Sequence, residues 1–401
     1  MPSATQPDES KLAKPRILLI LTTALLIVFY TVFAASNVNV MLSMRATQPT
    51  ITMLNHELPQ SDYARFWYVG RRLLSRVGGV APPNPGVFPL DILSPTAPAL
   101  KAWLYPPPTG LLAMPFAVLP LALSFWVWRI LSLALGLWLL RRAELGWAVV
   151  LAGLASPAAL HDMTGGQNGT LTGAMLVASL LLAERQQRFA GTLAGLLCIK
   201  PQIALTVPAA FLRTRFLCLL GTAASVVLSV VLLCLFVEGR RAWVQYFTVA
   251  QPDSTAIVGL PFTVFFPVAG ITVLSMLRSM HCGVGLAWLC QIFVSLLSVG
   301  LVWLAWRRGT MQEVPRMAFT CCLGVLAMPY GFSYDLVAFS IGMAALFFRA
   351  GQWERLVLGL LWLMGGYTIT LANYTGLLLF PLWAACGAAM AWRLRASPAA
   401  Q

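Results

Sequence analysis

FLCLLGTAASVVLSVVLLCLFV, residues 216–237, decides the fold class of this chain. The stretch contains no charged residue, and at 1.5 Å per residue it is long enough to cross the hydrocarbon core of a bilayer as one helix. Lipid offers no hydrogen-bond partner to an exposed backbone, so a segment of this composition is expected to be helical. Residues 216–237 therefore predict a transmembrane helix.

The rest of the chain has the same character. Hydrophobic residues make up 59% of the 401 residues, charged residues only 10%, and the mean hydropathy is +0.78. Soluble domains carry about 25% charged residues, so lipid must be the solvent for much of this surface. We expect an all-α, polytopic transmembrane bundle of about 10–12 membrane helices.

Basic residues indicate how the chain is threaded. The formal net charge is +14, and the basic clusters lie between apolar runs, which is typical of cytoplasmic loops rather than of nucleic-acid binding. The first apolar run, 17–35, follows basic residues and predicts an uncleaved anchor. With every basic cluster inside, both termini are cytoplasmic, residues 146–161 cross the membrane outward and the turn 161–168 faces out. Residues 238–258 then form a second outer loop, and residues 259–277 are either an outer-surface helix or a further crossing. The clusters are Arg141–Arg142, Arg185/Arg188, Arg213/Arg215, Arg307–Arg308/Arg316, Arg349/Arg355 and Arg393/Arg395.

One transmembrane domain is expected to cover residues 1–401. It comprises a cytoplasmic tail at 1–16, a first periplasmic loop at 36–108 and the remaining helical bundle at 109–393. Within the loop, residues 62–76 have helical spacing and predict an amphipathic helix that lies in the membrane interface.

A broken apolar segment carries an intramembrane lysine. Two short apolar pieces, 189–199 and 202–212, are divided by Lys200 and Pro201. Proline disfavours helix at the residue before it, and arginines at both outer ends favour the cytoplasm, so we expect a broken hairpin with Lys200 at its tip. A lysine there must reach the surface or find an anion, which makes Lys200 a functional candidate.

Three acids, Asp62, Asp162 and Asp335, lie where an outer loop meets an apolar segment. Ionisable groups at such depths are costly and are candidates for function. Asp62 has an equally strong alternative, an acid stabilised by the dipole at a helix start. Arg65 and Arg72 of the same helix either bind a lipid phosphate or form a solvated face.

Further candidates are uncharged or isolated. Arg129 is a second cation inside an apolar run, and Tyr105 is most simply an interfacial aromatic. Gln167 and Asn168 lie in a glycine-rich outer turn, where their amides can bind sugar hydroxyls. His161 is isolated in the sequence. The chain has no HExxH, phosphate loop or GxSxG motif, which argues against zinc chemistry and ATP hydrolysis.

The order of these motifs resembles glycosyltransferase family 87, the DUF2029 group of bacterial polyprenyl-phosphate-sugar-dependent transferases with the GT-C fold. The resemblance extends over about residues 15–390. The motifs that carry it are Ser61-Asp62-Tyr63 with Tyr68, Tyr105-Pro106-Pro107, Gly166-Gln167-Asn168, Ile199-Lys200-Pro201, and Pro329 to Ser333-Tyr334-Asp335-Leu336.

The resemblance implies a hexosyltransferase of the bacterial inner membrane whose site faces the periplasm. Its partners are a polyprenyl-phosphate sugar donor, mannose being one candidate sugar, a lipid or glycan acceptor and membrane lipids; no nucleic acid, cofactor or metal ion is indicated. Direct attack by an acceptor hydroxyl inverts the anomeric centre. Asp62 is expected to be the general base. The donor phosphate is assigned to Lys200, Arg65, Arg72 and Arg129, and substrate binding to Tyr105, Gln167, Asn168 and Asp335.

Two departures and two alternatives stay open. Residues 79–98 form a longer proline-rich stretch than the family has, and Tyr334-Asp335 replaces the histidine motif of the mannosyltransferase branch, so a mannose donor is not specified. A transporter or lipid flippase also needs intramembrane cations, although the missing internal repeat and the large outer loop count against it. An O-antigen polymerase or ligase is the other alternative. The acceptor, the linkage and the oligomeric state leave no signal in the sequence.

Overall fold

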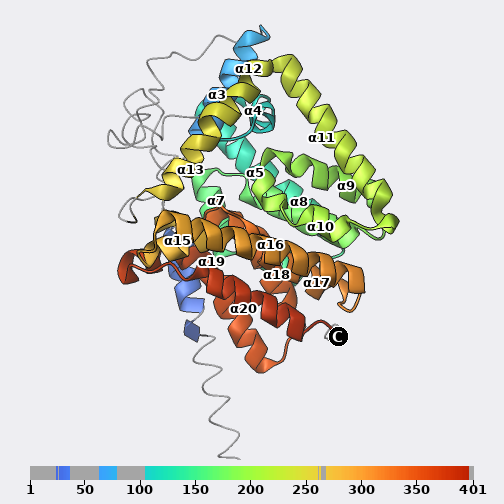
Figure 1. Cartoon of the computed structure of the whole chain (residues 1–401), viewed down its shortest axis with the longest axis vertical. Coiled ribbons are helices and arrows are strands. Elements are labelled where there is room, and N and C mark those ends of the chain that lie inside the picture. Colours follow the sequence, from blue (N-terminus) through green and yellow to red (C-terminus); the bar gives the residue numbers. More distant parts are fainter. Residues whose placement is uncertain are drawn as a thin grey trace, which may run out of the picture.

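The computed structural model describes residues 24–25, 27–36, 63–78, 104–260, 262 and 268–396. Within these ranges every regular element is a helix, apart from one isolated β-bridge between Gly270 and Phe332 (Figure 1). The predicted all-α class is confirmed. The assignment of 36–108 to an outer loop stays a prediction, because most of that range lies outside the described residues.

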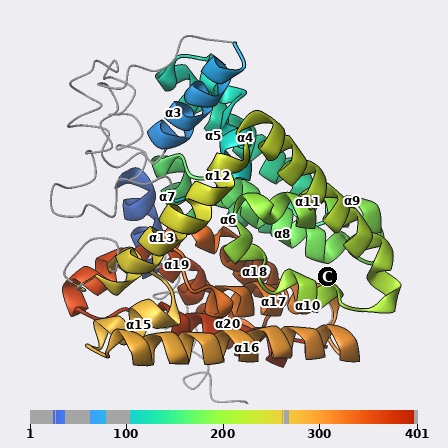
Figure 2. The same ribbon diagram turned by 45° about the horizontal axis from the view of Figure 1, so that its top comes forward.

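Four helices are long and apolar enough to cross a membrane alone: α5 (Leu121–Arg142), α11 (Leu217–Val237), α16 (Val284–Arg308) and α19 (Gln352–Thr375). The run 216–237 thus forms α11, as predicted. Only 6% of the apolar window of α11 and 17% of that of α16 is buried, so lipid covers most of both helices. They form two outer edges of the molecule in Figure 2. The chain is a polytopic membrane protein, and the count of 10–12 crossings stays a prediction.

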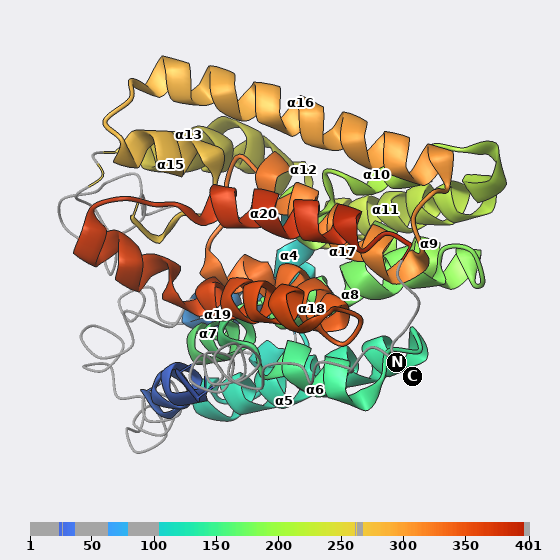
Figure 3. The same cartoon turned by 90° about the horizontal axis from the view of Figure 1, so that it is seen from below.

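The helices at the centre of the bundle are shorter. They include α8 (Gly169–Leu182), α17 (Glu313–Ala327) and α18 (Val337–Phe347), and the partly exposed α20 (Phe380–Arg393) packs on α17. Every residue of α8 is buried, and Figure 3 shows α17 and α18 between α16 and α5 at opposite edges. At 1.5 Å per residue α8 is about 21 Å long, less than the thickness of a hydrocarbon core. Its first residue therefore lies inside the bundle rather than at the surface.

The segment around Lys200 is broken as predicted. Helix α9 (Gln187–Leu196) continues into a 3-10 turn (Leu197–Ile199), and after Lys200 a second 3-10 turn (Pro201–Ala204) leads into α10 (Val207–Phe211). Gly191 packs against the backbone near Leu219 and Gly195 against that near Ala223. Because the contact on α11 advances with the chain on α9, the two helices run parallel. The chain between them must therefore return through α10, with Lys200 at the tip.

The helix expected at 62–76 is α3 (Tyr63–Arg76). It packs on α4 (Pro107–Ala113) and on a 3-10 turn (Phe116–Val118), and it buries Tyr63, Phe66 and Leu73. Gly70 is needed at this contact, since a Cβ there would lie 2.7 Å from the Ala113 carbonyl oxygen. Helix α3 thus lies on protein along its buried face. Asp62 is outside the described residues.

Two expectations for the second outer segment change. Most of the segment 238–258, expected as a loop, is helical. From residue 240 on, α12 (Arg240–Gln245), a π-helical turn (Tyr246–Ala250) and α13 (Gln251–Gly259) follow without interruption. Among its described residues, the ambiguous stretch 259–277 holds the last residue of α13, two helical residues at 268–269 and the start of α15 (Val273–Ser279), and none of these pieces is long enough to cross the membrane.

The remaining helices, α6 (Trp147–Leu154) and α7 (Pro157–Gly165), divide the predicted crossing at 146–161 into two. The break is at Ser156, whose hydroxyl accepts a hydrogen bond from the amide of Ala159 and caps α7, with Pro157 in the first turn. Helix α7 is therefore separate from α6, and its C-terminus leads into the turn at 166–168.

The basic clusters gather at one end of the bundle, as the topology requires. Arg185 pairs with Glu144 and with Glu313, and Glu184 pairs with Arg215 at 2.6 Å and Arg316 at 2.9 Å. The other clusters are connected by hydrogen bonds. The side chain of Arg142 donates to that of Gln186, the side chain of Arg349 donates to that of Gln312, and the backbone amide of Gln312 donates to the backbone carbonyl of Arg395. We call Glu144, Glu184, Arg185, Arg215, Glu313 and Arg316 the ionic ring. The grouping of the clusters is confirmed, and the side of the membrane they face stays a prediction.

Candidate active site

A buried ion pair lies at the tip of the broken hairpin. The ammonium of Lys200 pairs with the carboxylate of Asp335, and the side chains are 2% and 1% exposed. The same ammonium donates a hydrogen bond of 3.1 Å to Asn168 Oδ1 and lies 4.7 Å from the ring centroid of Tyr334. Three motifs that are far apart in the sequence therefore meet here. The anion that Lys200 was expected to find is a carboxylate of the protein itself.

Asp162 holds the turn that carries Gln167 and Asn168. Its carboxylate oxygens accept hydrogen bonds from the amides of Gly169 at 2.6 Å and Thr170 at 2.9 Å, the first residues of α8. These amides have no partner within the helix, so Asp162 supplies one from α7. The turn is thereby fixed at both of its ends.

Two glycines allow the close approach of these segments. Gly166 has φ +66°, and a Cβ there would lie 2.7 Å from Cβ of Tyr63. Gly169 lies so close to the carbonyl oxygen of Tyr334 that a Cβ would overlap it. A side chain at Gly169 would separate α8 from the segment that contains Asp335.

A hydrogen bond that the sequence did not reveal joins His161 to the same cluster. Ser333 Oγ and His161 Nδ1 are 2.6 Å apart, and Asp335 Oδ2 accepts a hydrogen bond of 3.0 Å from the amide of Phe332. The expectation that His161 is isolated is therefore wrong. Its partner is 172 residues away, and the only sequence signal was that Ser333 belongs to the late motif.

Tyr105 and Gln167 connect the cluster to α3 and α4. The Tyr105 hydroxyl donates to Gln167 Oε1 at 2.8 Å, and its ring lies 4.9 Å from that of Phe66 on α3. The hydroxyl of Thr109 on α4 donates to the carbonyl of Ile199, next to Lys200, at 2.7 Å. Tyr105 is thus part of the site rather than a simple interfacial aromatic.

The predicted phosphate ligands divide into two groups. Arg129 is 3% exposed, its guanidinium lies over the rings of Phe125 and Trp126 at 4.7 and 4.5 Å, and it interacts electrostatically with Asp162. Arg65 is half-buried and Arg72 exposed on α3. Arg129 therefore belongs to the buried cluster with Lys200, whereas Arg65 and Arg72 lie outside this cluster, on the neighbouring helix α3.

The start of α3 lies beside the turn at 166–168. Tyr63, the residue after Asp62, is buried against Phe125 and Trp128, with ring centroids 5.5 and 6.0 Å apart, and its hydroxyl is 2.5 Å from Ser124 Oγ. The proposed base therefore precedes, in the chain, a residue that contacts the candidate site.

The cluster is recessed and nearly neutral. Helix α5 has 22 residues and α8 has 14, and both end near the ionic ring, so α8 begins about 12 Å below the start of α5. Arg129 and Lys200 face two acids, Asp162 and Asp335. Among the described residues, no group of three or more His, Cys, Asp or Glu side chains gathers in a way that could hold a metal ion.

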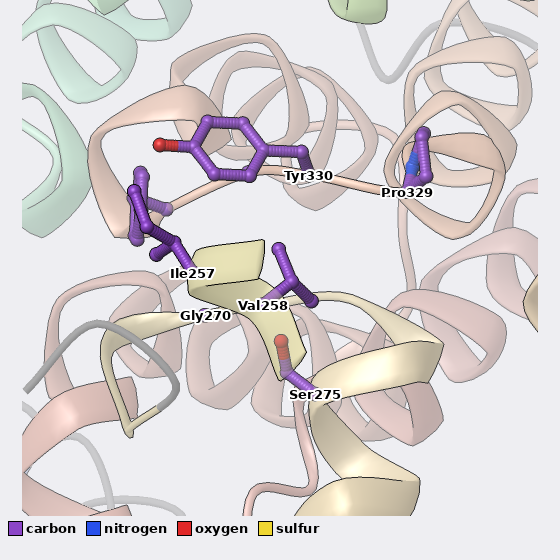
Figure 4. Close-up of a pocket in the computed structure, with 8 residues that line it drawn as sticks. Ile257, Val258, Gly270, Ser275, Pro329 and Tyr330 are labelled. Carbon is purple, nitrogen blue, oxygen red and sulfur yellow. The ribbon is translucent and has the colours of Figure 1, made fainter. Parts of the chain in front are cut away.

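A small apolar pocket lies on the other side of the segment that carries Asp335. It is lined by Ile257 and Val258 of α13, by Gly270 and Ser275, and by residues 329–332. In Figure 4 the ring of Tyr330 covers Ile257 and Val258. Because its lining is almost entirely apolar, we assign the pocket a packing role between α13, α15 and residues 329–332.

Comparison with known proteins identifies the family. The model of glycosyltransferase family 87 matches residues 103–329, more than half of the chain. No curated protein and no solved structure matches. The matched range contains the turn at 166–168 and Lys200, whereas Asp62 and Asp335 lie outside it. The chain belongs to glycosyltransferase family 87 and is a membrane glycosyltransferase.

Proposed function

We propose that this protein transfers a hexose from a polyprenyl phosphate to an acceptor hydroxyl, with inversion, at the outer face of the bacterial inner membrane. The observation that carries the proposal is the convergence of Gln167, Asn168, Lys200 and Asp335 in one buried cluster beside α3. A buried cluster of interacting polar and charged groups that come from three separate motifs is typical of a functional site.

Asp62 is proposed as the general base. The acceptor oxygen attacks the anomeric carbon while Asp62 takes its proton, and the bond between that carbon and the phosphate oxygen breaks. A single displacement of this kind inverts the anomeric centre. Support for Asp62 comes from its chain neighbour Tyr63, which is buried against Phe125 and contacts Gly166.

The leaving phosphate gains one negative charge and needs cations. Lys200 and Arg129 supply two, but Asp335 and Asp162 offset them. Helix α3 contains four arginines and no acid, so Arg65 and Arg72 are proposed to provide the surplus positive charge. Lys200 then contributes from below the phosphate, and its effect is strong because its surroundings exclude water.

The uncharged groups are proposed to orient the sugar. Lys200 can only donate hydrogen bonds, so the amide atom of Asn168 that faces it must be the oxygen. Asn168 Nδ2 is buried without a hydrogen-bond partner, which leaves a donor for an oxygen of the substrate. Tyr105 and Gln167, already bonded to each other, offer a hydroxyl and an amide for sugar hydroxyls.

The test is a transfer assay with the purified protein in nanodiscs. Radiolabelled polyprenyl-phosphate sugars are supplied one at a time with a membrane lipid extract, and products are separated and their anomeric configuration determined. The proposal predicts one labelled glycolipid or glycan with inverted configuration. Movement of intact donor across a liposome membrane without product would indicate a flippase. Product formation only from pyrophosphate-linked oligosaccharides would indicate a polymerase or ligase.

A further inference from the structure

Four exposed arginines lie at the end of the bundle away from the ionic ring. Two, Arg72 and Arg76, are on α3, and two, Arg240 and Arg241, begin α12. We call these four residues the outer arginine patch. Figures 1 and 2 show α12 near α4. None of the four takes part in the buried cluster, and of them only Arg72 has a role in the proposed reaction.

Glu238 connects the two halves of this patch. It caps the C-terminus of α11, two residues before Arg240, and its carboxylate lies against Gly110 of α4. Arg76 of α3 interacts with it electrostatically. The last turn of α11 therefore brings the start of α12 to the end of α3.

The patch has a surplus of positive charge. Helices α3, α4 and α12 contain no acidic residue, and Glu238 is half-buried, which raises its pKa to about 7. One partly protonated acid cannot balance four arginines. Most of the other basic residues that the structure describes lie at the opposite end, so these arginines depart from the usual asymmetry of membrane proteins and call for an anionic partner.

The surface next to Arg240 and Arg241 is aromatic and apolar. The rings of Trp243 and Phe247 stack with centroids 6.3 Å apart, and Tyr246 lies 5.1 Å from Phe247. Phe247 is 63% exposed and Val244 55%. A helix with arginines beside exposed aromatic and aliphatic side chains has the composition of a segment that lies in the membrane interface.

We propose that the outer arginine patch and the adjoining face of α12 bind the phosphate headgroups of anionic phospholipids, which hold α12 and α13 in the plane of the membrane interface. The arginines contact the headgroups, and Val244 and Phe247 reach the acyl boundary. A lipid fits better than a soluble anion because charge and exposed apolar surface occur on the same short helix. This inference does not depend on the proposed transfer reaction.

The experiment places a fluorophore at position 244. Val244→Cys is made in a variant whose 8 native cysteines are replaced, and the labelled full-length protein is reconstituted in phosphatidylcholine nanodiscs. Acyl-brominated phosphatidylcholine or phosphatidylglycerol is added at equal mole fraction, because bromine quenches on contact. We expect phosphatidylglycerol to quench roughly threefold more strongly or better.

Matched variants assign the preference. Arg240→Gln with Arg241→Gln should remove it, whereas Arg307→Gln with Arg308→Gln, two exposed arginines at the other end of the bundle, should leave it unchanged. A label at Leu289, on the lipid face of α16, should be quenched equally by both lipids. All six are surface positions, so folding is expected to be retained.

Three results would overturn the inference. Equal quenching by both lipids at Val244 would show that the patch does not select anionic headgroups. No quenching by either lipid would place α12 in water and favour a soluble partner. Loss of the preference on addition of inorganic phosphate would show a general phosphate site rather than a lipid surface.

Discussion

Ion pairs occur at one end of this bundle and in its interior toward the other end, but they differ in burial and in consequence. In the ionic ring the side chains of Arg185 and Glu144 are 37% and 68% exposed, whereas those of Lys200 and Asp335 are 2% and 1% exposed. Exposed pairs contribute about 0–1 kcal/mol, while removal of one partner from a buried pair costs about 3–5 kcal/mol. The charges of the ionic ring thus reflect the topology of the chain, whereas the charges of the buried cluster stabilise the candidate site.

The largest difference between the two ends is expected in catalysis. Asp62→Asn should reduce glycosyl transfer by about 10²–10⁴-fold, because asparagine cannot take the acceptor proton. Donor binding and detergent stability should stay near wild type. The same change at the other end, Glu184→Gln, should leave the rate unchanged. Initial rates with a saturating donor measure both.

Asparagine is also a good residue at a helix start, so a purely structural Asp62 would make Asp62→Asn nearly silent. An inactive Asp335→Asn beside an active Asp62→Asn would move the base to a different carboxylate.

The next largest effect concerns stability. Lys200→Met should lower the free energy of unfolding by about 3–5 kcal/mol, since Asp335 is left buried without its cation. Lys200→Met combined with Asp335→Leu should recover part of that loss. Denaturation in detergent measures the complete cycle, with Arg185→Met as the exposed control. A double variant no more stable than Lys200→Met would mean that the two residues are not energetically coupled.

Backbone contact in the cluster gives the third prediction. Gly169→Ala should destabilise by about 1–3 kcal/mol and impair transfer, because the new methyl group overlaps the Tyr334 carbonyl. Gly300→Ala on α16 is the matched control, with open space around its Cβ position. Thermal unfolding and the transfer assay measure both variants. Equal stability and equal activity of the two variants would contradict the close contact between Gly169 and Tyr334.

The fourth prediction is a pH dependence from Glu238. Burial raises its pKa from 4.5 to about 7, so between these values the folded protein holds a proton that the unfolded chain has released. Stability from this group is therefore complete below pH 4.5 and declines as the pH rises to about 7. Thermal unfolding of Glu238→Gln across this window should lack that decline. An identical pH profile in both proteins would rule out the raised pKa.

The smallest effect is expected in the ionic ring. Arg185→Gln should cost about 0.2–1 kcal/mol, and the loss should shrink further at high salt because both of its partners are exposed. Unfolding at low and high ionic strength measures it. A salt-independent loss above about 2 kcal/mol would show that the two ends do not differ in the way described.

Much of the architecture could be read from local patterns. Length and hydropathy identified α11, charge asymmetry grouped the six basic clusters, and Pro201 placed the break at Lys200. These features depend on chemistry within one segment, namely the cost of exposing backbone or charge to lipid. The order of the motifs was enough to indicate the family, and these motifs contain Gln167, Asn168, Lys200 and Asp335.

Other features depend on residues that no local pattern connects. The partner of Lys200 is 135 residues away and that of His161 is 172 away, so neither pair leaves a spacing signal. The helical segment 240–259 leaves no clear signal in the sequence, because its aromatic and polar residues lack a clear apolar period. Hydropathy and charge thus determined by themselves that the chain spans a membrane and that its six basic clusters lie together at one end of the bundle. Only the tertiary structure decided which buried charges neutralise each other, because that depends on which helix ends meet.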